Sequence, residues 1–320
     1  MAAIDFKALL LEERRKQREG RAEATQATPQ AVNIAPQQPI PDPHAFAFPA
    51  YSIAARPVIN LADFSVGSID CVAYCPSFVT RSEARAIVDM VYAVPRSNSR
   101  WVQLRGRALQ CWGGTPPEPR RTELAPKPFE AEPLPEWLAR LCDSLAECGV
   151  FPAAAPPNHV LINEYHAGEG ILPHTDGPAY DARTATLSLS VGDNEEAIAD
   201  EAEERCGSGG AARRVAFGAV MTFTPRQLTS EVGIRPAPLP ACEVALRPQS
   251  LVVFEGSAYR DHTHAIDAIS AAGGLCHDIV GAKAPLVNTK AAGVAHGDFL
   301  RRPSVRISLT FRRITPSPWP

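Results

Sequence analysis

Residues 163–176 read NEYHAGEGILPHTD and hold the most informative pattern in the chain. His174 and Asp176 are separated by one residue, so in an extended segment both side chains leave the same face. An imidazole and a carboxylate, completed by a second histidine, form the facial triad that binds non-haem Fe(II). Because a histidine and an aspartate at this spacing also occur together in solvated loops, the interpretation depends on a partner elsewhere in the sequence.

Two later histidines, His262 and His264, could complete the triad. They lie in residues 250–266, SLVVFEGSAYRDHTHAI. Both would leave the same side of an extended strand, so alternation does not separate them. We favour His264 because two apolar residues, Ala265 and Ile266, follow it directly, whereas His262 lies nearer the preceding loop.

Residues 305–312, VRISLTFR, predict a strand with one apolar and one cationic face. The apolar face carries every second residue from Val305, and the other face carries Arg306, Ser308, Thr310 and Arg312. If the polar face met only water, two arginines there would be unremarkable. Beside a metal, Arg306 could instead hold a dicarboxylate through two parallel hydrogen bonds. Asn163 and Tyr165 share a face of an earlier strand and could add neutral donors.

The order of the elements predicts a mostly β fold with flanking helices. The 31 prolines and 21 glycines favour turns over a helical bundle. Helices are predicted from Thr80 or Ser82 to Ala93 and after Pro135. Short strand patterns follow, which favours a sandwich or jelly roll; these runs are 159–165, 184–191, 219–223, 242–246, 250–255 and 304–313.

Outside this core, the pattern divides the chain into three parts. Residues 1–20 predict an amphipathic helix, either a docking helix for a protein partner or a solvated tail. Residues 21–58 are rich in Pro, Gln and Ala and predict a disordered linker. The remaining domain, 59–320, contains two low-complexity stretches, near 193–214 and 268–297, which we expect to be surface loops.

Charge and composition exclude several classes of protein. The net charge is −3, so no global positive field attracts nucleic acid. The eight cysteines form no C-x-x-C pair, which gives little support to a zinc ribbon. The sequence shows neither a signal peptide nor a long apolar run. We therefore expect a monomer of the nucleus or cytoplasm that has no membrane partner.

Taken together, these motifs resemble those of the AlkB-like Fe(II)- and 2-oxoglutarate-dependent dioxygenases. The shared features, in order, are Asn163-x-Tyr165, His174-x-Asp176, the later His264, and Arg306 with Arg312 in the R-x-S-L-T-F-R run. The similarity spans about residues 67–314. It is strongest to the sixth-homologue subfamily, through the runs WVQL (101–104), WGG (112–114), PEWL (135–138) and GEGILPHTDGP (168–178).

The resemblance implies a double-stranded β-helix, which is a jelly roll with the metal at its mouth. It implies that His174, Asp176 and His264 bind Fe(II), and that Asn163, Tyr165 and Arg306 hold the co-substrate 2-oxoglutarate. It places Arg312 near the co-substrate or the substrate. It does not extend to Ser308, where many members have Asn, or to residues 177–180, which lack the acidic residue that repair members use.

The resemblance also implies oxidative removal of an alkyl group, with nucleic acid as the substrate class. In the region that resembles the nucleotide-recognition lid, arginines alternate with aromatic residues, a composition suited to phosphates and bases. Trp101 and Trp112 could equally be core anchors beside solvated arginines. A hydroxylase of proteins or small molecules and a low-turnover binding module remain alternatives; the lid candidates are Arg96, Arg100, Trp101, Arg105, Arg107 and Trp112.

Overall fold

The computed structural model describes most of the predicted domain. The expected amino-terminal helix, 1–20, and the linker up to residue 46 lie outside the described residues. The described residues are 47–67, 69, 71–114, 116, 129, 131–191, 203–205, 212–226, 239–270 and 276–314.

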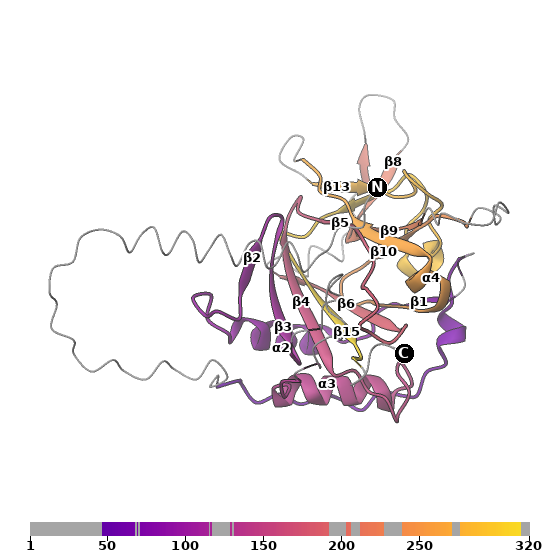
Figure 1. Cartoon of the computed structure of the whole chain (residues 1–320). Coiled ribbons are helices and arrows are strands. Elements are labelled where there is room, and N and C mark those ends of the chain that lie inside the picture. Colours follow the sequence, from indigo (N-terminus) through magenta and orange to yellow (C-terminus); the bar gives the residue numbers. More distant parts are fainter. Residues whose placement is uncertain are drawn as a thin grey trace, which may run out of the picture.

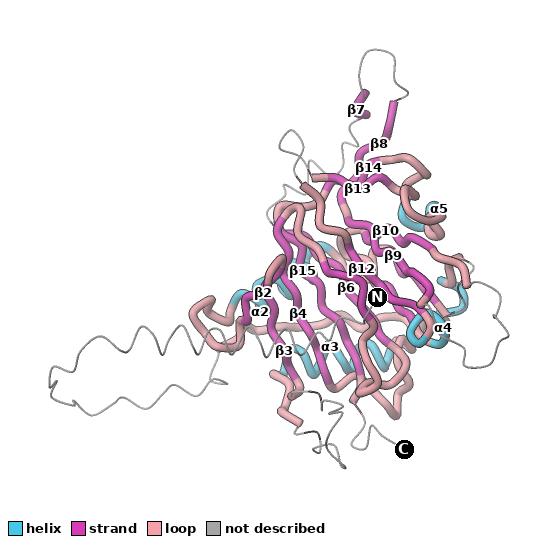
Figure 2. Tube along the Cα trace, turned by 45° about the horizontal axis from the view of Figure 1, so that its top comes forward, coloured by secondary structure: helices cyan, strands magenta, loops and turns pink. Residues whose placement is uncertain are grey.

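Two sheets form the jelly roll that the sequence predicts, and Figures 1 and 2 show their strands. The larger sheet has seven strands in the order β1 (Val72–Cys75), β11 (Leu251–Phe254), β6 (Thr184–Val191), β15 (Val305–Arg312), β4 (His159–His166), β3 (Arg107–Trp112) and β2 (Val102–Leu104). The smaller sheet has the order β10 (Cys242–Leu246), β9 (Ala219–Pro225), β12 (His262–Ile266) and β5 (Ile171–His174). Neighbouring strands in both sheets run antiparallel.

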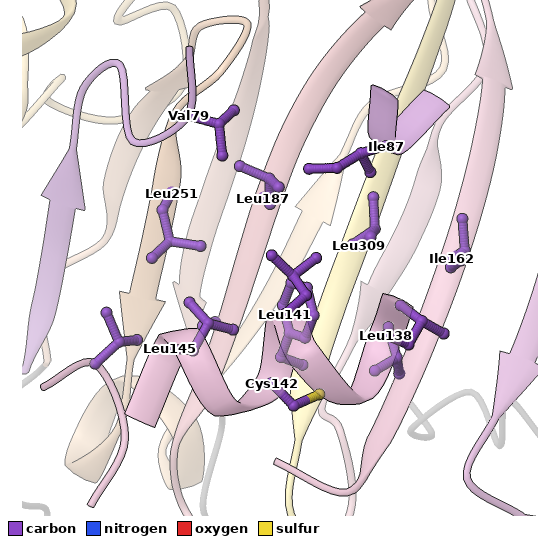
Figure 3. Close-up of a cluster of buried hydrophobic side chains, with 14 of the residues drawn as sticks. Val79, Ile87, Leu138, Leu141, Cys142, Leu145, Ile162, Leu187, Leu251 and Leu309 are labelled. Carbon is purple, nitrogen blue, oxygen red and sulfur yellow. The ribbon is translucent and has the colours of Figure 1, made fainter. Parts of the chain in front are cut away.

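Two helices cover the outer face of the larger sheet, α2 (Arg81–Tyr92) and α3 (Glu136–Glu147). Thr80 begins α2 with a reciprocal capping box to Glu83, as the predicted start requires. From α3, Leu138, Leu141 and Leu145 approach the strands (Figure 3). Burial of each leucine contributes about 1.5–3 kcal/mol. The shorter helical segments are η1 (Leu61–Phe64), α4 (Gly256–Arg260) and α5 (Thr289–Ala292).

Strand β15 shows how the alternating sequence pattern positions the site. Ile307, Leu309 and Phe311 are fully buried in the core beneath the helices. The alternate residues occupy the opposite face, where Arg306 and Arg312 are each only 6% exposed. The solvent-facing interpretation of the two arginines is therefore wrong, because this polar face is enclosed within the fold.

Residues 47–58 differ from the disordered linker that the sequence predicts. They contain no helix or strand, yet Phe48, Tyr51 and Ile53 pack against the core. The Phe48 ring lies 6.4 Å from that of Trp112. Aromatic side chains anchor this segment even though it lacks a periodic apolar pattern, so the packed part of the chain starts before residue 59.

The two low-complexity stretches are also more ordered than the surface loops we expected. The first contains β7 (Glu203–Arg205) and the start of β8 (Ala212–Phe217), while the second contains β13 (His277–Ile279) and α5. With β14 (Phe299–Arg301), these three strands form a further sheet, β13-β14-β8-β7. Val280 is fully buried, and Glu243 accepts hydrogen bonds from backbone N–H groups of residues 281, 283 and 284. The sequence did not predict this order, because the small residues that pack here produce no regular spacing of apolar side chains.

Among the residues that the structure describes, no helix is long and apolar enough to cross a membrane.

Candidate metal and co-substrate site

The structure brings His174, Asp176 and His264 together between the two sheets. His174 ends β5 and is paired directly with His264 on β12, while Asp176 follows two residues after His174. One potential ligand atom from each of the three residues lies within 4.8 Å of the others. This spacing allows all three to reach a single ion.

His262 does not join this cluster. Its Nδ1 lies 3.0 Å from the carbonyl oxygen of Ser257 and its Nε2 lies 3.0 Å from that of Pro240. Both ring nitrogens are therefore directed at backbone carbonyls. The structure thus groups His264, the histidine favoured from the sequence, with His174 and Asp176.

Two neighbours hold the Asp176 carboxylate. Arg312 donates from Nη2 to Oδ1, and Thr184 donates from Oγ1 to Oδ2 at 2.8 Å. Burial would raise the pKa of Asp176, but Arg312 and the two histidines lower it to about 2. The sequence places Arg312 near the co-substrate or the substrate. In the structure its guanidinium contacts the carboxylate of Asp176, a candidate metal ligand, and lies 4.9 Å from the Tyr180 ring centre.

Both candidate histidine ligands are held neutral. Burial, and then the nearby His174, lower the pKa of His264 to about 3. Burial also lowers the pKa of His174, against the opposing effect of Asp176. At neutral pH the cluster therefore presents two neutral imidazoles and one ionised carboxylate, the protonation state in which these groups bind a divalent metal.

Arg306 lies on the same inner face, farther along β15. It is opposite Tyr165 on β4, with its guanidinium 5.4 Å from the Tyr165 ring centre. Its Nη2 donates to Ser188 Oγ at 2.8 Å, while its Nε is buried with no hydrogen-bond partner among the described residues. Burial lowers the pKa of Arg306 to about 10, which leaves it charged at neutral pH.

Asn163 completes this second group. It lies opposite Ser308 across the β4–β15 pair, and its Oδ1 is also buried without a hydrogen-bond partner in the described part of the chain. Buried polar atoms in native proteins are nearly always satisfied. Arg306 and Asn163 are thus an enclosed guanidinium and amide with unused hydrogen-bonding capacity, and they fit a bound carboxylate such as that of 2-oxoglutarate.

The residues predicted to contact substrate separate into two groups. Trp112 is 3% exposed in the core, where its Nε1 donates to Gln110 Oε1 at 2.9 Å, and Trp101 packs at the edge of that core. These contacts fit the alternative that the sequence left open, in which both tryptophans anchor the core. Arg105 is exposed in the β2–β3 turn. Arg107 is buried on β3, and its positive charge is one of the causes that lower the pKa of His174.

Sequence reasoning missed several residues near the cluster. His159 lies opposite Arg312 on β4, with its Nε2 3.3 Å from Cys111 Sγ and its ring centre 5.3 Å from that of Tyr180. Alternation along residues 159–165 places His159 on the face of Asn163 and Tyr165, so that signal could have identified it. Thr184 and Tyr180 carry no comparable signal, because their role depends on contacts across the fold.

Comparisons with known proteins agree with this geometry. The family model described as the 2OG-Fe(II) oxygenase superfamily matches residues 74–312. The chain belongs to this superfamily. It is therefore a dioxygenase whose cofactor is Fe(II) and whose co-substrate is 2-oxoglutarate.

Similarity to a curated protein confirms the AlkB-like resemblance. The chain is 31% identical over 243 residues to the Danio rerio protein named "Probable RNA/DNA demethylase ALKBH6", an alignment covering 76% of this chain and 85% of that protein. The solved structure of OsALKBH1 covers 78% of this chain and all of its own, at 13% identity and a TM-score of 0.43. A 2OG-Fe(II) oxidoreductase from Burkholderia pseudomallei covers 75% of this chain and 82% of its own, at 11% identity and a TM-score of 0.37.

Proposed function

We propose that this dioxygenase removes alkyl groups from nucleic acid oxidatively. In this proposal His174, Asp176 and His264 hold Fe(II), and Arg306, Tyr165 and Asn163 hold the distal carboxylate of 2-oxoglutarate. The observation that carries the proposed substrate class is the 31% identity, over most of both chains, to a relative named as an RNA/DNA demethylase.

The bound pair supplies the chemistry: iron and 2-oxoglutarate together use dioxygen to hydroxylate a C–H bond, with 2-oxoglutarate converted to succinate and carbon dioxide. Where the carbon is a methyl group on nitrogen, the hydroxylated product breaks down to formaldehyde and the demethylated base. The protein's own part is to bind, orient and enclose these groups.

The surroundings of the ligands support this role. His174 Nδ1 lies 2.9 Å from the carbonyl oxygen of Leu172, which favours the tautomer that keeps the proton on Nδ1. Its Nε2 lone pair is then available to a metal. Arg312 and Thr184 fix the Asp176 carboxylate in its ionised form. These contacts orient two of the three ligands before an ion binds.

The β2–β3 hairpin supports nucleic acid as the substrate. The hairpin runs from buried Arg107, whose positive charge helps to lower the pKa of His174, to exposed Arg105 at the turn. A Cβ on Gly106 would lie 3.6 Å from the carbonyl oxygen of Gly170, so the turn borders the loop that leads into β5. Arg96 is half-exposed over the Trp101 ring, 4.0 Å from its centre, but its guanidinium already pairs with the buried Glu164 carboxylate, so Arg105 is the hairpin's exposed cation. A local exposed cation such as Arg105 can bind a phosphate despite a net charge of −3.

Substrate class is tested by formaldehyde and succinate release with a panel of methylated single-stranded oligonucleotides and methylated peptides. The proposal predicts formaldehyde release with at least one oligonucleotide and none with the peptides. Turnover of peptides alone would instead assign a protein hydroxylase. Succinate release that no substrate stimulates would contradict the demethylase proposal.

Binding is tested separately by Arg105→Glu, with Arg140→Glu as the matched control because Arg140 is exposed on α3. We expect Arg105→Glu to weaken oligonucleotide binding and to lower the slope of log affinity against log salt by about one. The control should leave both unchanged. Equal affinities for wild type and Arg105→Glu would remove the hairpin from the proposal.

A further inference from the structure

The strand pair that carries both histidines has few interactions of its own. β5 has only four residues and lies at the edge of the smaller sheet, where β12 is its one neighbour among the described strands. Two register pairs join the strands, His174 with His264 and Ile171 with Ile266, and the register is irregular between them. A short, irregular edge pair fixes its spacing weakly. Contacts at the far end of the pair therefore help to set the separation of the two histidines.

Arg302 makes such contacts at that far end. It lies between β14 and β15 and is only 6% exposed. Its Nη1 donates to the carbonyl oxygen of Glu169 at 3.0 Å, and its Nη2 donates to that of Asp267 at 2.9 Å. Glu169 lies just before β5 and Asp267 directly follows β12. One guanidinium thus joins the chain entering the His174 strand to the chain leaving the His264 strand.

The same two segments meet through their backbones. A Cβ on Gly170 would lie 2.2 Å from the carbonyl oxygen of Ile266, so only glycine fits this approach. The backbone N–H of Ile269 donates to the carbonyl oxygen of Gly168 at 2.8 Å. Arg302 therefore holds together two segments that are already closely packed. Because these segments continue directly into β5 and β12, a change in their spacing would shift both strands.

Asp278 of β13 orients this guanidinium. Its Oδ2 lies 2.5 Å from Arg302 Nε and its Oδ1 lies 2.7 Å from Arg302 Nη2. The Oδ2 atom also accepts the backbone N–H of Val220 on β9 at 3.1 Å. Asp278 is 8% exposed, so the pair is buried. A bidentate pair of this kind fixes the plane of an arginine in a way that lysine cannot reproduce.

We infer that Arg302, oriented by Asp278, is a positioning residue that sets the spacing of the two histidine ligands. In this inference the Ala/Gly-rich stretch at 268–297 contributes to the geometry of the metal site, because it supplies Asp278. The inference rests on the proposed metal ligands His174 and His264.

Metal affinity measured apart from turnover tests the inference. Mn(II) binding is titrated by electron paramagnetic resonance for Arg302→Lys and Asp278→Asn, and stability is measured by urea denaturation. The control is Arg56→Gln, which breaks the largely buried Arg56–Glu83 pair (2.9 Å) on the side of α2. We expect both test variants to weaken Mn(II) binding about tenfold. The control should lose stability but bind Mn(II) as wild type does. Wild-type affinity in both test variants would overturn the inference.

Hydrogen exchange gives a readout for a variant too unstable for titration. In Asp278→Asn without metal, the amides of residues 171, 172 and 174 and of residues 264–267 should exchange faster, whereas those of α3 should not. Unchanged protection of both strands would overturn the inference even if the metal ligands are correct. Failure of the metal proposal itself has a different signature, because Mn(II) would then bind His174→Ala as well as wild type.

Discussion

The guanidinium of Arg312 is hydrogen-bonded to Oδ1 of Asp176, the carboxylate that lies beside both candidate histidine ligands. Both side chains are buried, so each charge depends on the other. A bound divalent cation would be a second positive partner for the same carboxylate.

We therefore predict that Arg312→Gln destabilises the metal-free protein by about 3 kcal/mol, because it leaves a buried carboxylate without its cation. Saturating Mn(II) should restore part of that loss, since the ion then balances Asp176. Urea denaturation of wild type and variant, with and without Mn(II), measures both effects. An equal stabilisation by Mn(II) in the two proteins would mean that ion and arginine do not share the carboxylate.

Arg306→Lys should raise the KM for 2-oxoglutarate by about 10–100-fold, because a charge-assisted paired contact worth about 1.5–3 kcal/mol is lost. Mn(II) affinity should change little, since Arg306 is not a ligand. Steady-state succinate release gives KM, and the metal titration gives affinity. Arg140→Lys, which alters an exposed arginine on α3, is the control. An unchanged KM in Arg306→Lys would remove Arg306 from the co-substrate site.

His159 predicts a pH-dependent stability. Burial and then Arg312 lower its pKa in the folded protein to about 3, below the ordinary value of 6.5. Between these values the unfolded chain binds a proton that the folded chain does not, so stability falls as the pH is lowered from 6.5 towards 3. The loss is at most about 1.4 kcal/mol per pH unit for this residue. His159→Gln should flatten the curve of unfolding free energy against pH, and an identical curve in the variant would contradict the prediction.

Leu141→Ala should destabilise the fold by about 2–5 kcal/mol, because Leu141 is 1% exposed where α3 packs against the larger sheet. Mn(II) affinity should be retained under native conditions, since α3 covers the face of the sheet opposite the site. Val58→Ala is the control, because Val58 is 78% exposed, and it should change stability by less than about 0.5 kcal/mol. A similar loss in both variants would contradict this view of the core.

The parts of the site that the sequence predicted are those governed by short-range alternation. Arg306 and Arg312, and likewise Asn163 and Tyr165, share a face because strands alternate with a period of two residues. His174 and Asp176 also come together as predicted, although β5 ends at His174 and Asp176 lies beyond it. The same rule found the apolar face of β15 and most strands of the larger sheet. It could not separate His262 from His264; in the structure both ring nitrogens of His262 face backbone carbonyls, whereas His264 lies with His174 and Asp176.

The parts that sequence reasoning missed depend on long-range contacts or on small residues. Asp278 and Val280 lie in a stretch whose Ala- and Gly-rich composition suggested a loop, yet both are buried. Trp112 was a candidate for substrate binding because arginines precede it in the sequence. In the structure its side chain leaves β3 on the face that packs into the core. The contact of Arg312 with Asp176 joins β15 to the segment that follows β5, far away in sequence, and no local pattern predicts it.

Anaerobic addition of Fe(II) and 2-oxoglutarate, followed by visible absorption spectroscopy, tests the central claim most directly. We predict a charge-transfer band with one iron per chain, retained in His262→Ala and lost in Asp176→Ala and His264→Ala. A band that persists in Asp176→Ala, or one that disappears in His262→Ala but not in His264→Ala, would contradict the assignment of the metal ligands.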